Sequence, residues 1–250
     1  MSIELIDAQC GFGGANAGDP LTVSAGDLIE EMGRVGIAGA LVRRVPDALM
    51  EDVSALNEVL YAAHAAHPSL IPCPVVVPGR SGSLPSEQEQ VAVHASRGCG
   101  AVTIRPRDDH WSLAWWMSDR LFTVLEERQV PVFCLMSRVG LEDVGSIAER
   151  FPGLPIIVAG VEYMQHRVLL SLLEAFPRVH LSVGTNYTVH YGIEELVAKT
   201  GPDRLLFGTG YPQVEPMAAV TQLMYSDIGE DERRLIGAGN MRRLIAEVRR

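Results

Sequence analysis

The chain has 250 residues, 47% hydrophobic and 21% charged, which excludes the disordered, collagen-like and disulfide-scaffold classes and predicts a large folded core. Its 31 acidic and 21 basic residues give a net charge of −10, which disfavours nucleic acid and acidic membranes as partners. No apolar stretch approaches the roughly 20 residues that span a bilayer, and the N-terminus does not resemble a signal peptide, so we expect a cytoplasmic protein. Four widely spaced cysteines predict reduced thiols.

Short apolar runs alternate along the chain with longer segments of helical periodicity. The runs typical of buried strands cover residues 3–7, 38–43, 70–77, 101–105, 130–135, 155–159, 179–183 and 205–208. The clearest helical segments cover residues 52–67, 113–128, 141–150, 166–176, 193–199 and 216–226. Ser24 and Ser86, each followed three residues later by an acid, are typical helix N-caps. A last amphipathic helix is predicted from Glu230 to Arg249.

This order of strands and helices predicts parallel strands joined by right-handed crossovers. The predicted fold class is α/β, a (β/α)8 TIM barrel that forms a single domain over residues 1–250 with a C-terminal helix. A doubly wound open sheet is the alternative, but the chain lacks the glycine-rich phosphate loops of nucleotide-binding sheets. The apolar face of the C-terminal helix suits packing on the barrel or on a second subunit equally well, which leaves a homo-oligomer open.

Several segments of the chain match motifs of a known family. The strongest are FPGLPIIVA at 151–159, FPRVHLS at 176–182 and GPDRLLFGTGYP at 201–212, and IDA at 6–8 and GAVTIRP at 100–106 support them. Together they resemble the amidohydrolase-related family of metal-dependent hydrolases and decarboxylases. The resemblance implies a barrel with one or two divalent metals at the mouth formed by the C-terminal strand ends. There the metal supplies hydroxide and an aspartate handles the proton.

The sequence departs from the family pattern at each implied metal ligand. Gln9 and Gly11 replace the H-x-H pair of the first strand, Leu135 and Gly160 replace the histidines of strands five and six, and Gly210 replaces the aspartate after strand eight. These side chains do not make a metal site, so we expect no metal and no other cofactor. A shift of one residue in strand five would bring Cys134 into the mouth, but one thiolate does not make a site.

Arginines follow the ends of several predicted strands. They are Arg43, Arg44, Arg80, Arg105, Arg107 and Arg138. Guanidinium groups suit bidentate capture of carboxylate or phosphate, so we predict an anionic small-molecule ligand that these arginines, except Arg44, bind together with Gln9. The alternative is that they form ordinary ion pairs with acids of neighbouring loops, such as Asp108 and Asp109.

Two side chains in the loops that follow the later strands are predicted catalytic groups. Glu162 follows Gly160 by two residues, and His190 lies in the loop after strand seven; either is suited to act as a general base. His110, Tyr163 and Tyr211 follow strands four, six and eight and are predicted to contact the ligand. The alternative for each is a hydrogen-bonded loop residue. The only lysine, Lys199, ends a helix and is badly placed for Schiff-base chemistry.

Two functional hypotheses follow. The first is a non-catalytic or degenerate enzyme that binds an anionic, carboxylated small molecule at the mouth without a metal. The second is a metal-independent enzyme, either a lactone or ester hydrolase or a decarboxylase of an organic acid, in which an arginine stabilises the developing negative charge. They differ in whether replacing Glu162 or His190 abolishes turnover.

Overall fold

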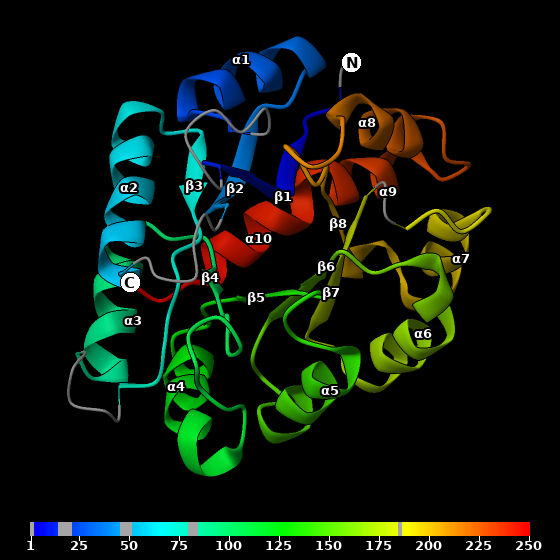
Figure 1. The fold of residues 1–250 in the computed structure, drawn as a ribbon. Helices are drawn as coiled ribbons and strands as arrows, with labels where there is room; N and C mark the ends of the chain where they lie inside the picture. The colour runs from blue at the N-terminus through cyan, green and yellow to red at the C-terminus, as the bar shows by residue number, and fades with distance from the viewer. Residues whose placement is uncertain (1–2, 15–21, 46–51, 80–84, 185–186) are drawn as a thin grey trace.

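The computed structural model describes residues 3–14, 22–45, 52–79, 85–184 and 187–250, and they form the predicted (β/α)8 barrel, with helices around the strands (Figure 1). The strands are β1 Ile6–Phe12, β2 Gly39–Arg44, β3 Leu70–Pro72, β4 Val102–Thr103, β5 Val132–Leu135, β6 Ile156–Ala159, β7 Val179–Val183 and β8 Leu205–Phe207. The helices that follow them are α1 Ala25–Val35, α2 Val53–Ala66, α3 Glu87–Ser96, α4 Trp115–Glu127, α5 Leu141–Arg150, α6 His166–Ala175, α7 Gly192–Thr200 and α8 Pro216–Met224.

The strands pair in parallel and in chain order within two sheets, β1-β2-β3 and β4-β5-β6-β7-β8. A bridge between Val75 and Thr103 joins the segment after β3 to β4. At the other seam, the N–H of Gly210 donates to the carbonyl of Gln9 at 2.7 Å, and the N–H of Gly11 donates to the carbonyl of Tyr211 at 3.0 Å. The chain after β8 is therefore bonded to β1, which brings the first and last strand ends to one mouth.

Alternation along the strands divides the core into two clusters. One packs between strands and outer helices, and the other fills the barrel with residues such as Ile6, Leu41, Phe133 and Leu206. The C-terminal segment joins the inner cluster through Ala238, Met241 and Leu244, so it packs on the barrel. Instead of one continuous helix it consists of α9 Glu230–Arg234, a π-helical turn at Leu235–Gly239 and α10 Asn240–Glu247.

The N-cap predictions are confirmed, since Ser24 and Ser86 both form capping boxes. The boundaries of the early strands were less accurate: β1 starts and ends later than predicted, and β3 ends at Pro72 rather than at residue 77. Pro72 and Pro74 lack the N–H that a longer ladder needs. Within the described residues, no helix has both the length and the apolarity to cross a membrane.

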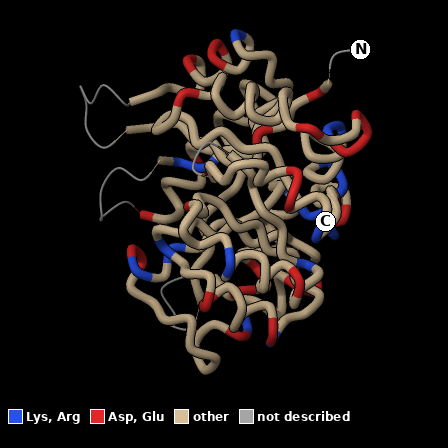
Figure 2. The backbone as a smooth tube through the Cα atoms, turned by 90° about the vertical axis from the view of Figure 1, so that its right-hand side faces the viewer, with Lys and Arg blue, Asp and Glu red and all other residues tan. Residues whose placement is uncertain are grey.

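Most charged residues lie at the surface, whereas the cysteines and several polar or charged side chains are buried. Acidic and basic residues are interspersed over the outer elements (Figure 2). The four cysteines are free and buried, as predicted. His94, on α3, is one of these buried polar residues, with its Nδ1 2.7 Å from the hydroxyl of Tyr61. The helical period alone did not distinguish the two faces of α3, whose apolar residues are few.

Candidate functional site

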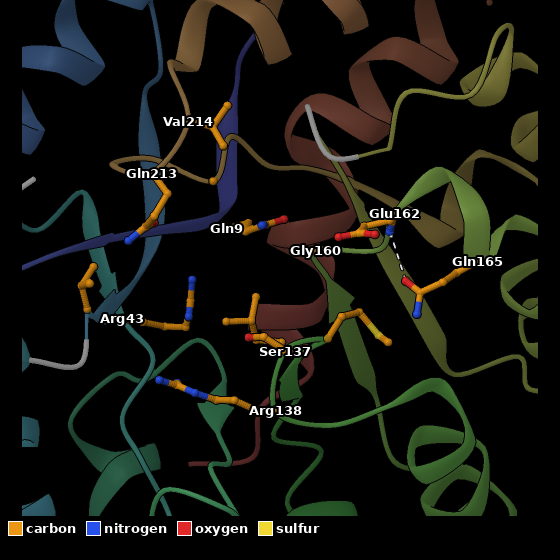
Figure 3. A pocket seen from close by; sticks show the side chains of 13 residues that line it. Gln9, Arg43, Ser137, Arg138, Gly160, Glu162, Gln165, Gln213 and Val214 are labelled. Atoms are coloured by element: carbon orange, nitrogen blue, oxygen red, sulfur yellow. Dashed lines mark hydrogen bonds between the residues drawn. The ribbon is translucent and has the colours of Figure 1, made fainter. Parts of the chain in front are cut away.

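A cavity of about 650 Å³ opens at the C-terminal ends of the strands, where enzymes of this architecture bind their ligands (Figure 3). Its wall comes from β1, β2, the loops after β5 and β6, and the turn after β8. The lining residues are Gln9, Arg43, Val45, Leu135, Met136, Ser137, Arg138, Gly160, Glu162, Gln165, Gly210, Gln213 and Val214. Four residues predicted from the sequence are among them: Gln9, Arg43, Arg138 and Glu162.

A β-bulge places Gln9 in this wall. The pairing of β1 with β2 shifts between Asp7 and Cys10, so Ala8 packs in the inner core cluster while Gln9 lines the cavity. The side chain of Gln9 is 7% exposed, and its Oε1 accepts from the hydroxyl of Ser182 at 3.2 Å. Bulges commonly re-aim one side chain beside a binding site, and this one supplies a fixed amide.

Arg43, at the end of β2, brings a cation to the cavity. Its guanidinium lies over the ring of Phe133, 4.4 Å from the centroid. Its Nε is shielded from solvent and has no hydrogen-bond partner among the described residues, which also give Arg43 no ion pair. Burial lowers the pKa of this guanidinium below its ordinary value. Arg43 is therefore a donor that the described part of the protein leaves unsatisfied.

Arg138 and Glu162 face the same space from the loops after β5 and β6 (Figure 3). Nε of Arg138 lies 2.8 Å from Oδ2 of Asp108, so this arginine forms one of the ion pairs expected as the alternative to ligand binding, but its terminal nitrogens have no partner among the described residues. Burial lowers the pKa of Arg138 as well. Glu162 is exposed, and its N–H donates to Oε1 of Gln165 at 3.1 Å, which fixes the start of the loop. Two guanidiniums and one carboxylate thus line one cavity.

The structure places most of the other predicted site residues outside this cavity. Arg105 is bound on both edges by Asp109, with Nε to Oδ2 at 3.1 Å and an Nη to Oδ1 at 2.6 Å, so the ion-pair alternative holds for Arg105. Arg107, His110, Tyr163 and His190 are exposed, and the ring of His190 packs against Tyr191. Tyr211 is partly buried and is not among the residues that line the cavity. Arg80 lies outside the described residues.

Sequence reasoning missed several polar residues of the mouth. Ser137, Gln165 and Gln213 line the cavity, and no recognisable motif marks them. Asp7 is buried and accepts hydrogen bonds from Thr209, at 2.5 Å from the hydroxyl and 3.0 Å from the N–H. Burial raises the pKa of this carboxyl. Through these hydrogen bonds Asp7 links β1 to the segment that follows β8.

A second cleft, of about 520 Å³, adjoins the mouth because Arg138 lines both cavities. Its other walls come from the loop after β4 and the starts of α4 and α5. The lining residues are Pro106, Arg107, Trp111, Ser112, Leu113, Ala114, Trp115, Arg138, Asp143, Ser146 and Arg150. Trp111 is 9% exposed, and its Nε1 is buried with no hydrogen-bond partner among the described residues.

The residues at the mouth do not fit the metal that the family resemblance implies. Gln9, Leu135, Gly160 and Gly210 line the cavity where ligands would be required, while Cys134 is buried between the sheet and the helices. Over the described ranges, no group of three or more His, Cys, Asp or Glu side chains is arranged to hold a metal ion. A glutamine with leucine and glycines offers a single weak donor.

Comparisons with known proteins agree with the barrel. A 5-carboxyvanillate decarboxylase from Sphingomonas paucimobilis is similar with a TM-score of 0.76 at 14% identity, over 98% of this chain and 99% of that chain. A dihydroxybenzoic acid decarboxylase from Polaromonas, solved with bound manganese and 2-nitroresorcinol, has a TM-score of 0.73 at 15% identity, over 98% and 97%. An uncharacterised TIM-barrel protein from Bordetella bronchiseptica has a TM-score of 0.70 at 18% identity, over 98% and 99%.

At these identities the solved structures establish the fold alone. No curated protein matches the sequence. A family model described as amidohydrolase matches residues 11–245. Because that match spans nearly the whole sequence, the chain belongs to the amidohydrolase family.

Proposed function

We propose that the protein binds an anionic, carboxylated small molecule at the C-terminal mouth without a metal. The observation that carries the proposal is Arg43, a half-buried arginine at the cavity wall whose Nε is shielded from solvent and has no partner among the described residues. A carboxylate placed between Arg43 and Arg138 would satisfy Nε of Arg43 and the terminal nitrogens of Arg138. The decarboxylases with the same fold are named for carboxylated aromatic substrates, which supports this ligand class.

The energetics favour a ligand over a purely structural role for Arg43. Burying a cation without a carboxylate partner costs free energy, and only part of that cost is offset by the contact with Phe133. Methionine has a similar length and packs on an aromatic ring without that cost. We therefore expect Arg43→Met to leave the ligand-free protein equally stable or more stable by about 1 to 2 kcal/mol.

The test compares benzoate with benzamide, its uncharged isostere, by isothermal titration calorimetry. Wild-type protein is expected to bind benzoate and to discriminate against benzamide. Arg43→Met should weaken benzoate binding about tenfold or more, because a charge-assisted hydrogen bond contributes about 1.5 to 3 kcal/mol. Arg43→Lys keeps the charge but not the paired donors and should give an intermediate Kd. Equal binding of benzoate and benzamide, or an unchanged Kd in Arg43→Met, would refute the proposal.

A second candidate function is decarboxylation of the bound acid, because Glu162 lines the same cavity as the two arginines. In that reaction Glu162 acts as an acid rather than as the general base expected from the sequence: its protonated form gives its proton to the ring carbon that bears the carboxylate. The bond from that carbon to the carboxylate then breaks, its electron pair returns to the ring, and CO₂ leaves. Water returns a proton to Glu162.

This candidate is tested by CO₂ release from 2,6-dihydroxybenzoate in the presence of a chelator, with metal content measured on the same sample. Turnover that survives chelation, and that disappears in Glu162→Gln while the Kd is kept, would support it. Binding with no CO₂ release in the wild type would leave the binding function alone. His190→Gln is the control, because His190 lies outside the cavity and its loss should not change turnover.

A further inference from the structure

Two buried donors, one in each adjoining cavity, lack partners among the described residues. Nε of Arg43 belongs to the mouth, and Nε1 of Trp111 belongs to the wall of the second cleft. Buried N–H groups in folded proteins nearly always have an acceptor, so each orphan needs an explanation. Arg138 lines both cavities and is the point where they meet.

The second cleft has a different chemical character from the mouth. Trp111 and Trp115 give it an aromatic wall, and Trp115 is 68% exposed, which is unusual for so large an apolar side chain. Arg107 is exposed at the edge, whereas Arg150 is held by Asp119 and by the carbonyl of Leu113. A flat ring suits these walls, and an acceptor on that ring would satisfy the indole N–H.

We infer that the ligand is elongated and occupies both cavities. Its carboxylate lies at Arg43 and Arg138 in the mouth, and a second, planar group with a hydrogen-bond acceptor lies against Trp111 and Trp115. This inference rests on the proposed function, which it deepens by naming the second half of the ligand. The two cavities together exceed what a single-ring acid requires.

Three probes separate the contributions. Benzoate fills the mouth alone, 4-benzylbenzoate adds a second ring without an acceptor, and 4-benzoylbenzoate adds the same ring with a ketone oxygen. Calorimetry on the full chain should show both two-ring acids binding about tenfold more tightly than benzoate, from burial of the second ring. The ketone should add a further gain of about threefold to tenfold over the benzyl compound.

Variants of the two tryptophans show which side chain accounts for the tighter binding of the two-ring acids. Trp111→Phe keeps an aromatic ring but removes the N–H, so it should bring the Kd of the ketone and benzyl compounds together while leaving benzoate within about twofold. Trp115→Ala, at an exposed site where folding is not at risk, should reduce the advantage of both two-ring acids. Thermal melts of each variant establish that it is folded.

Nuclear magnetic resonance gives a readout that does not depend on any variant folding well. The chain has three tryptophans, so a proton–nitrogen spectrum holds three indole cross-peaks. Saturating 4-benzoylbenzoate should shift the Trp111 cross-peak more than 4-benzylbenzoate does. An unmoved Trp111 cross-peak at saturation, or a ketone advantage that persists in Trp111→Phe, would overturn the inference.

The outcomes also separate this inference from the proposed function. If benzoate binds through Arg43 but the two-ring acids bind no more tightly, the elongated ligand is wrong and the proposed function stands. If no carboxylate binds, or Arg43→Met has no effect, the proposed function fails and this inference fails with it.

Discussion

His180 makes the stability of the barrel depend on pH in a calculable way. It lies on β7 opposite Ile157, a residue of the inner core cluster, and it is 2% exposed. Neither ring nitrogen has a hydrogen-bond partner of good geometry among the described residues; a weak contact with the backbone of Asp203 is the nearest approach to one. Burial, reinforced by the charges of Arg204, Arg243 and Arg178, lowers its pKa from 6.5 to about 3. The folded protein therefore holds this imidazole neutral.

The sign follows from proton binding. Between pH 6.5 and about 3 the unfolded chain protonates this histidine and the folded chain does not, so stability falls as pH falls below 6.5. At pH 5 the loss is about 2 kcal/mol, since about 1.36 kcal/mol corresponds to each of the 1.5 pH units below 6.5. His94, whose pKa burial lowers to about 4, adds a loss of the same sign.

The perturbation is His180→Leu, which replaces two unpaired ring nitrogens with apolar atoms of similar volume. Urea unfolding followed by circular dichroism and tryptophan fluorescence at pH 7.5, 6.5, 5.5 and 5 should give a variant that equals or exceeds the wild type at pH 7.5. Its advantage should grow by about 2 kcal/mol at pH 5. His190→Gln, at an exposed histidine, should parallel the wild type. If the His180→Leu and wild-type curves are parallel, the reasoning about burial is wrong.

Two further predictions concern the buried carboxylate of Asp7 and the ion pair between Arg105 and Asp109. Asp7→Ala should lower the free energy of unfolding by about 3 kcal/mol or more, because it strands buried donors, including two from Thr209; Asp7→Asn, which keeps one acceptor oxygen, should lose less in the same urea melts. Arg105→Met should destabilise the protein by about 3 kcal/mol by leaving Asp109 unpaired, yet the folded fraction should bind benzoate with the wild-type Kd.

The barrel was predictable because its signals are local and repeated. Apolar runs of strand length and the capping boxes at Ser24 and Ser86 are properties of short segments. Both capping boxes are confirmed, and a strand overlaps each of the eight predicted runs, although the bounds of several strands differ. The choice of Leu135 over Cys134 as the mouth-facing residue of β5 is confirmed for the same reason: alternation along a strand fixes the face of every residue once one is known.

The composition of the site was only partly predictable because it depends on contacts between distant segments. Periodicity placed both Arg105 and Arg43 at strand ends. Only the folded chain shows that Arg105 forms an ion pair with Asp109, whereas Nε of Arg43 has no hydrogen-bond partner among the described residues. The bulge that turns Gln9 into the cavity depends on the register between β1 and β2, which no pattern within β1 specifies.

The contrast between these two arginines carries the functional argument. Arg43 lies near the end of β2 and Arg105 lies two residues after β4. The side chain of Arg105 is buried and Nε of Arg43 is shielded from solvent, so each arginine loses solvation on folding. Arg105 recovers that free energy inside the protein through a bidentate ion pair, and therefore has no donor edge left for a ligand. Arg43 recovers only a contact with the face of Phe133, which leaves its Nε–H without an acceptor. An arginine that faces a cavity and has an unpartnered Nε is the feature from which the proposed anionic ligand is inferred.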